Sequence, residues 1–205
     1  MKMSETCMPE MLDVAFALAG DNLPTEHRWP LWQALVDALP WLEDEPLAGV
    51  HALRVIESDY GVSLLPRRAK LTLRLPLGRA RAAAELSGHR LAVAGQTLQV
   101  GAHQISPVRG AATLYSDFVI TGSAEEADFC RDIEAELAHL GVRCRTICGG
   151  RRAMRADDRL LAGFALALHD MSVADGRLLQ QAGLGREHRL GCGILVQHKA
   201  ITGLA

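Results

Sequence analysis

Hydrophobic positions along this chain of 205 residues follow two spacings in turn, one typical of strands and one of helices. Residues 12–18 form a short apolar run that ends at Gly-Asp-Asn, which predicts a buried strand. Three leucines at every fourth position then predict a helix that begins near Glu26 and ends before Pro40. A strand is expected over residues 50–56, followed by a hairpin around residues 59–61.

The clearest alternation lies in residues 67–76. One side of this predicted strand would be apolar, with Ala69, Leu71, Leu73 and Leu75. The other side would be mostly cationic, with Arg68, Lys70, Thr72 and Arg74. Side chains on one face of a strand are about 6.6 Å apart, close to the phosphate spacing of an RNA strand. This face is therefore either an RNA-binding row, to which Arg67 would add, or a solvated outer face of a sheet.

A helix over residues 78–86 and a strand over residues 90–100 would complete a β-α-β-β-α-β unit, the ferredoxin-like pattern. The second half of the chain repeats this order without a clear sequence repeat. Its expected elements are a strand over residues 108–122, a helix over 124–140, strands over 143–148 and 160–169, a helix over 172–181 and a strand over 194–196. Ser123 and Glu126 suggest a capping box at the start of the first of these helices, and Gly141 would end it.

The pattern therefore predicts an α+β protein of two tandem ferredoxin-like domains. The first domain would cover residues 1–105 and the second residues 106–205. The second would include a basic turn over residues 149–155, which contains Arg151, Arg152 and Arg155.

A glycine-rich loop precedes the last predicted strand. It contains Gly183, Gly185, Arg186, Arg189, Gly191 and Gly193. Exposed N–H groups between arginines would make a cradle for phosphate. A Walker-type loop follows a strand and opens a helix, whereas this loop follows a helix and opens a strand. The order argues against a nucleotide pocket and for either a bound polymer or an ordinary glycine-rich turn.

Charge is segregated along the chain, although the net charge is only −2. The first 60 residues contain three Lys or Arg and eleven Asp or Glu, and the rest contain nineteen and thirteen. A local basic region is enough for phosphate contacts. No apolar run reaches the ~18–20 residues that span a bilayer, and the start of the chain lacks a signal-peptide core. We expect a cytoplasmic protein without a membrane partner.

The five cysteines form no C-x-x-C pair, and no histidine cluster completes a metal site. We expect reduced thiols, no metal and no cofactor. Aromatic residues make up only 4% of the chain, and exposed pairs of the kind that stack bases in common RNA-binding sheets are not evident. The composition thus favours readout of RNA through phosphates and shape.

Several segments, taken in order, resemble one protein family. They are Asn22–Leu35, Pro40–Leu42, Gly49–His51, Leu71–Pro76, and Gly163–Leu166 followed by the glycine-rich loop. Together they are similar to the RAMP proteins of CRISPR systems, specifically the MYXAN branch of the endoribonuclease that cuts precursor CRISPR RNA within each repeat. The resemblance covers nearly the whole chain.

The resemblance implies metal-independent cleavage of a repeat hairpin, in which a 2′-hydroxyl attacks the adjacent phosphate and leaves a 2′,3′-cyclic phosphate and a 5′-hydroxyl. It also implies that mature CRISPR RNA stays bound and that other Cas proteins join the product in an interference complex. The chemistry needs a base, an acid and cations near the phosphorane.

Three residues are candidates for these roles. His27 is the first choice for base or acid, because the family's histidine lies at the first helix and the positive end of that helix would lower its pKa. A surface or capping histidine is the alternative. His51 is the second choice, and its alternative is a hydrogen-bonded core histidine. Lys70 would stabilise the phosphorane.

The chain also departs from the family. Trp29 and Trp32 stand where relatives usually have tyrosines, and tryptophan supplies no proton at neutral pH. Tyr60 and Tyr115 match no aligned motif. A non-catalytic RNA-binding RAMP subunit therefore remains an alternative. A metabolic ferredoxin-like protein would need a small-molecule pocket, and the sequence offers no cofactor motif.

Overall fold

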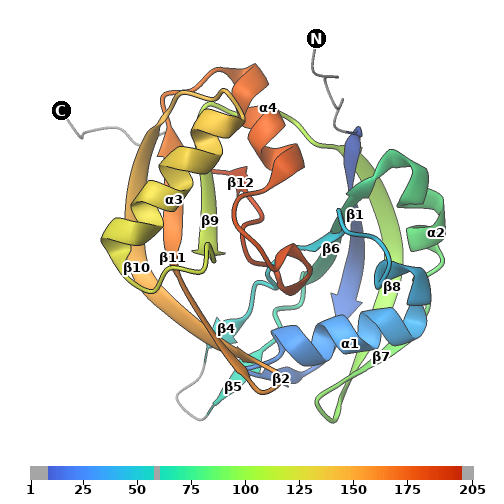
Figure 1. Cartoon of the computed structure of the whole chain (residues 1–205). Coiled ribbons are helices and arrows are strands. Elements are labelled where there is room, and N and C mark those ends of the chain that lie inside the picture. The colour runs from blue at the N-terminus through green and yellow to red at the C-terminus, as the bar shows by residue number, and fades with distance from the viewer. Residues whose placement is uncertain (1–8, 58–60, 200–205) are drawn as a thin grey trace.

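The computed structural model describes residues 9–57 and 61–199. It contains two main sheets, each with helices packed on one face (Figure 1). The hairpin expected around residues 59–61 falls mostly outside the described residues. In the part of the chain that the structure describes, no helix is long and apolar enough to cross a bilayer.

The first sheet has the strand order β3-β6-β1-β8-β7. Its strands are β1 (Met11–Ala19), β3 (Gly49–Val50), β6 (Lys70–Pro76), β7 (Arg90–Val93) and β8 (Gln96–Pro107). The helical segments that belong to it are α1 (Arg28–Ala38), η1 (Pro40–Leu42), η2 (Leu77–Arg79) and α2 (Ala80–Ala84). With β7 as an added edge strand, this is the order of a ferredoxin-like sheet.

The alternation in β6 explains how this unit is held together. Leu71, Leu73 and Leu75 are fully buried, as the sequence predicts, and they pack with Val14 and Phe16 of the neighbouring β1. β1 and β6 are antiparallel, and Asp13 lies directly opposite Arg74 in the register. The other face of β6 is thereby turned away from the helices.

The second sheet has the order β10-β11-β9-β12, again ferredoxin-like. Its strands are β9 (Leu114–Val119), β10 (Arg145–Ala156), β11 (Arg159–His169) and β12 (Val196–Gln197). α3 (Glu126–His139) and α4 (Val173–Ala182) contribute Phe129, Ile133 and Leu179 to its core. The predicted α+β class and ferredoxin-like architecture are confirmed.

Several local predictions are wrong. Residues 50–56 are not one strand, because pairing stops after β3 and resumes only at β4 (Ile56–Glu57). Residues 90–100 are split between β7 and β8 by a turn in which Ala94 and Gly95 both have positive φ. Ser123 does not cap α3: its hydroxyl donates to Asp132, 2.7 Å away.

The predicted basic turn at residues 149–155 is also wrong. These residues continue β10, which pairs with β11 across a bulge between Cys148 and Arg151. The chain reverses at Asp157, which has a positive φ. Gly149 and Gly150 form part of the bulged strand. The long hairpin reaches the first unit, where Met154 and Ala156 join its core (Figure 1).

A small third sheet was not predicted. It pairs β2 (Asn22–Pro24), β5 (Val62–Leu64) and β4 in the order β2-β5-β4. The predicted boundary between residues 105 and 106 falls inside β8, whose pairing with β1 continues to Pro107. A short helical turn, η3 (His188–Leu190), interrupts the glycine-rich loop before β12.

Candidate active-site cleft and nucleic-acid interface

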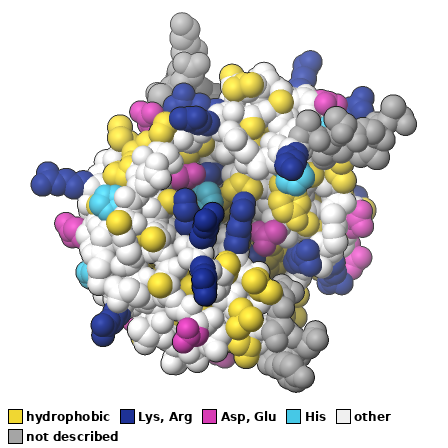
Figure 2. Space-filling model, turned by 180° about the vertical axis from the view of Figure 1, so that it is seen from behind, with side chains coloured by type: hydrophobic (Ala, Val, Ile, Leu, Met, Phe, Trp, Pro, Cys, Tyr) yellow, Lys and Arg dark blue, Asp and Glu magenta, His cyan; other side chains and the backbone are white. Residues whose placement is uncertain are grey.

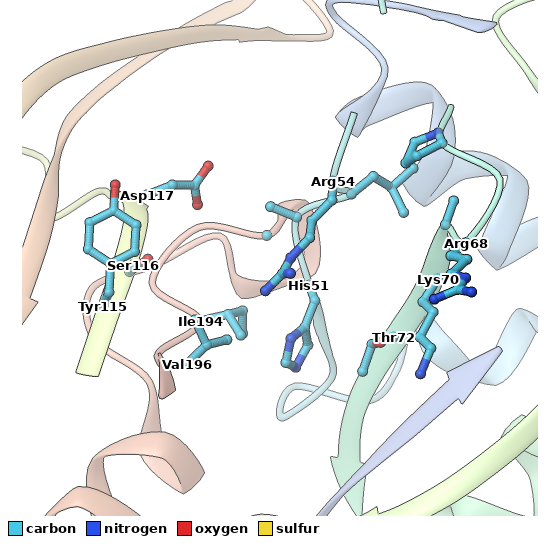
Figure 3. A pocket seen from close by; sticks show the side chains of 15 residues that line it. His51, Arg54, Arg68, Lys70, Thr72, Tyr115, Ser116, Asp117, Ile194 and Val196 are labelled. Atoms are coloured by element: carbon cyan, nitrogen blue, oxygen red, sulfur yellow. The ribbon is translucent and has the colours of Figure 1, made fainter. Parts of the chain in front are cut away.

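A cleft of about 720 Å³ lies where the uncovered face of β6 meets the second unit. Residues from β6 and the segment after β3 form one wall, and residues from β9 and the chain around β12 form the other (Figure 3). The labelled wall residues are His51, Arg54, Arg68, Lys70, Thr72, Tyr115, Ser116, Asp117, Ile194 and Val196. A site in this cleft therefore contains side chains from both units.

His51 sits in this cleft directly after β3. Its Nε2 lies 3.3 Å from Oδ1 of Asp13, and its side chain is 17% exposed. Nδ1 has no hydrogen-bond partner among the described residues. Burial, together with the charge of Arg74, lowers the pKa of His51, while the hydrogen bond to Asp13 works in the opposite direction. A neutral imidazole with a free nitrogen is suited to accept a proton.

Asp13 and Arg74 form a buried ion pair behind His51. Arg74 donates from Nε to Oδ1 at 2.8 Å and from Nη2 to Oδ2 at 3.0 Å. Burial alone would raise the pKa of Asp13, but the hydrogen bonds from His51 and Arg74 hold it well below its usual range. The carboxylate is therefore ionised at neutral pH.

The expectation of Arg74 as an RNA-binding cation on an open face is wrong. Its side chain is only 4% exposed. Besides Asp13, its Nη1 donates to the carbonyl oxygens of Gln180 and Leu195, at 2.9 and 2.8 Å. The alternating pattern correctly places Arg74 on the polar face of β6, but the second unit covers that face at the end of the strand where Arg74 lies.

The remaining cations of the row are accessible. Arg67, Arg68 and Lys70 are exposed, and Arg68 and Lys70 line the cleft together with Arg54. None of these four forms an ion pair with the described residues. Figure 2 shows Lys and Arg side chains gathered near the centre of this face, with a histidine beside them. The cleft thus offers positive charge to a phosphate chain.

Tyr115 and Asp117 line the opposite wall, two residues apart on β9. The ring of Tyr115 packs against His198, with centroids 5.4 Å apart. Asp117 accepts a hydrogen bond from Arg28 at 2.6 Å, and Arg28 also donates to the carbonyl of Gly191 at 3.3 Å. Arg28 therefore ties the start of α1 to the second unit.

His27 lies outside the cleft. It is the residue before α1, it is only 6% exposed, and its Nδ1 bonds to the carbonyl oxygen of Pro24 at 2.9 Å. Burial lowers its pKa, with a smaller contribution from the charge of Arg28. The structure places His51 and Lys70 in one cleft and His27 elsewhere.

The arginines of β10 lie on an exposed surface. Arg151, Arg152 and Arg155 are solvent-accessible and form no ion pair within the described residues. The backbone N–H of Arg155 donates to Glu26, which joins the hairpin to the first unit. Three free guanidinium groups on one hairpin suit phosphate binding.

The glycine-rich loop differs from the predicted phosphate cradle. The N–H groups of Gly183, Gly185, Gly191 and Gly193 all donate to protein oxygens, so these four amides are not free for phosphate. All four glycines have positive φ, and a Cβ on Gly193 would lie 1.9 Å from the carbonyl oxygen of Leu184. The glycines are needed for close packing of the loop.

The two arginines of the loop are partly engaged. Arg186 donates to the carbonyl of Thr121, although its side chain is exposed. Arg189 donates to Glu187 at 3.2 Å and lies over the ring of Trp32 at 6.0 Å. The loop joins the units, since Leu190 and Cys192 are buried in the core of the first.

Sequence reasoning did not identify Asp13 and Arg54, and it left Tyr115 unassigned. Asp13 is the third residue of the otherwise apolar strand β1, and a carboxylate in a buried strand is itself a signal of a charged partner. In the described part of the chain, no group of three or more His, Cys, Asp or Glu side chains is placed to hold a metal.

Comparison with known proteins identifies the family. The family model described as Cas6 Crispr matches residues 12–200. The chain belongs to the Cas6 family. A curated relative, the CRISPR-associated endonuclease Cas6 of Myxococcus xanthus strain DK1622, is 29% identical over 186 residues, which cover 90% of this chain and 80% of the relative. The resemblance seen in the sequence is confirmed.

Solved structures share the fold. A RAMP protein described as binding different RNA substrates matches with a TM-score of 0.65 at 14% identity, covering 91% of this chain and 98% of the other. A Cas6-related protein from Pyrococcus furiosus matches with a TM-score of 0.63 at 12% identity, covering 92% and 98%. These Cas6 and RAMP relatives have the same arrangement of sheets and helices.

Proposed function

We propose that this Cas6 protein is an endoribonuclease that binds the repeat hairpin of precursor CRISPR RNA and cleaves it within the cleft. The observation that carries this proposal is the position of His51: a buried imidazole of lowered pKa faces a cleft lined by Arg54, Arg68 and Lys70. The endonuclease description of the Myxococcus xanthus relative supports the same activity.

The proposed reaction needs no metal. Nδ1 of His51 takes the proton of the 2′-hydroxyl, and the 2′-oxygen forms a bond to the adjacent phosphorus. The bond from phosphorus to the 5′-oxygen breaks, and the 5′-oxygen takes up a proton from water to leave as a hydroxyl. The other product is a 2′,3′-cyclic phosphate. Lys70 stabilises the charge of the phosphorane.

His51 is preferred to His27 as the base. His51 lines the cleft beside cations and its Nδ1 has no hydrogen-bond partner among the described residues, whereas His27 lies outside the cleft with its Nδ1 bonded to the carbonyl of Pro24. His27 then has a structural role, because its hydrogen bond to Pro24 joins the start of α1 to β2.

The exposed arginines Arg151, Arg152 and Arg155 of β10 are proposed to contact phosphates of the repeat stem, and Arg67 and Arg68 those of the strand that enters the cleft. A helical RNA stem is read mainly through phosphates, 2′-hydroxyls and shape. Retention of the mature CRISPR RNA, and its passage with this protein to other Cas proteins, follow from the family and remain parts of the proposal.

The proposal is tested with end-labelled repeat RNA from the host's own array, incubated with the protein in EDTA. A parallel RNA carries a single 2′-deoxy nucleotide at the cut position. We expect one cut in the first RNA, ending in a cyclic phosphate, and none in the second. Tight binding without a cut would contradict the proposal and favour a non-catalytic RNA-binding subunit.

A further inference from the structure

Asp13 makes contacts with His51 and Arg74 that have no role in the reaction proposed above. Its Oδ1 lies 3.3 Å from Nε2 of His51 and 2.8 Å from Nε of Arg74, and its Oδ2 lies 3.0 Å from Nη2 of Arg74. Because Asp13 and Arg74 are paired across β1 and β6, the two strands fix the carboxylate independently of the loop that carries His51.

We infer that Asp13 is a positioning residue that holds His51 with its proton on Nε2 and its free electron pair on Nδ1, directed to the cleft. This inference rests on the proposed function of His51. An ionised carboxylate only accepts hydrogen bonds, so the nitrogen that faces it must carry hydrogen. The other nitrogen of a neutral imidazole is then the acceptor.

The same contact supports the charged form of His51. When Nδ1 takes the proton of the 2′-hydroxyl, the imidazolium donates from Nε2 to a carboxylate that is already ionised. The base is thereby oriented by a third group, the arrangement that catalytic imidazoles use in unrelated hydrolases.

Arg74 limits the effect of Asp13. It neutralises the carboxylate through two hydrogen bonds and is itself fixed by the carbonyls of Gln180 and Leu195. The other charged groups that face this region are Arg109 on one side and Arg54, Arg68, Lys70 and Asp117 on the other. The four cations oppose protonation of His51, and Asp117 is paired with Arg28. Asp13 is therefore the carboxylate whose contact with His51 favours protonation.

The test compares Asp13→Asn with Asp37→Asn, which removes the same charge from the exposed side of α1. Nitrogen NMR of histidine-labelled, RNA-free protein reports which ring nitrogen of His51 carries the proton. We expect the Nε2–H form in the wild type and in Asp37→Asn, and a mixture with the Nδ1–H form in Asp13→Asn. An unchanged spectrum in Asp13→Asn would overturn the inference.

Single-turnover cleavage supplies the second readout. In Asp13→Asn we expect the maximal rate to fall about tenfold or more, with the midpoint of the pH profile moved to lower pH and the Kd for RNA unchanged. A merely structural role would scale the rate equally at all pH values, and this result would contradict the inference.

The two proposals fail differently. If His51→Ala cleaves normally, the proposed role of His51 is wrong and the role of Asp13 fails with it. If His51→Ala is inactive while Asp13→Asn keeps the wild-type tautomer and pH profile, only the inference about Asp13 fails. Should Asp13→Asn not fold, Asp13→Glu keeps the charge opposite Arg74 but displaces the carboxylate from His51, and it is expected to change the tautomer as well.

Discussion

The pH dependence of cleavage should report the ionisation of His51. A base acts in its neutral form, and burial lowers the pKa of His51 below its ordinary value of 6.5. The single-turnover rate should therefore rise with pH, reach half of its maximum below pH 6.5, and stay level near neutrality. A midpoint above 6.5 would show that this imidazole is not the base.

Lys70 should act on the transition state more than on binding. Removing one group that stabilises developing oxyanion charge typically costs about 100-fold or more in rate. We expect Lys70→Met to lower the cleavage rate by about this factor and to change the Kd for RNA little. Arg81→Met, on the exposed side of α2, is the matched control and should leave both values unchanged.

At the scale of residues, the sequence predicted the cleft members His51 and Lys70 but ranked His27 first. The ranking used a position at the start of a helix, which does not reveal that the ring points to Pro24. Similarly, alternation showed that Arg74 and Lys70 share a face, but it did not show that the second unit covers one and leaves the other open.

At the scale of elements, the glycine-rich loop is predicted to be required for folding. In Gly193→Ala, a Cβ would lie 1.9 Å from the carbonyl oxygen of Leu184, and φ is +68°. Left-handed backbone costs a non-glycine residue about 1–2 kcal/mol, and the clash adds to this. We expect the free energy of unfolding in urea to fall by about 2 kcal/mol or more.

The matched substitution for this prediction is Gly78→Ala, where nothing lies within 4 Å of the added Cβ and φ is not positive. It should leave the free energy of unfolding nearly unchanged. If both variants were equally stable, the tight packing of the loop would not be a source of stability.

The hairpin of β10 and β11 should bind RNA through charge. Each phosphate contact to duplex nucleic acid adds about 0.9 to the slope of log K against log salt. The double variant Arg151→Ala/Arg152→Ala should weaken binding and reduce this slope by about 1–2. The control double variant Arg81→Ala/Arg90→Ala, at exposed positions of the first unit, should leave the slope unchanged. An equal loss of RNA affinity in the two double variants would contradict a specific role of the β10 arginines and show that overall positive charge is responsible.

Elements with strong local patterns were predicted best. The leucines of β6, the helix that Gly141 ends and the run of β1 all form as expected, because burial on one face requires each pattern. The β10 hairpin was missed because two glycines and several arginines are typical of a turn, whereas here they form a bulged strand that pairs with β11. Pairing between distant segments, as in the β2-β5-β4 sheet, leaves little local signal.

At the scale of the whole molecule, the two ferredoxin-like units meet through Arg28, the buried Arg74 and the glycine-rich loop. Arg28 and Arg74 of the first unit donate to backbone carbonyls of the second, and Leu190 of the loop is buried in the core of the first. The cleft exists only because the units are joined in this way. The order of elements and the family resemblance predicted both units, but neither could predict which side chains the junction buries.

The most direct test of this account compares His51→Ala and His27→Ala in single-turnover cleavage of repeat RNA in EDTA, with His139→Ala, at an exposed site, as the control. We predict that His51→Ala loses cleavage by about 100-fold or more while it still binds RNA. His27→Ala, once shown to be folded, should cut at close to the wild-type rate. Normal cleavage by His51→Ala together with loss of cleavage in folded His27→Ala would contradict the account.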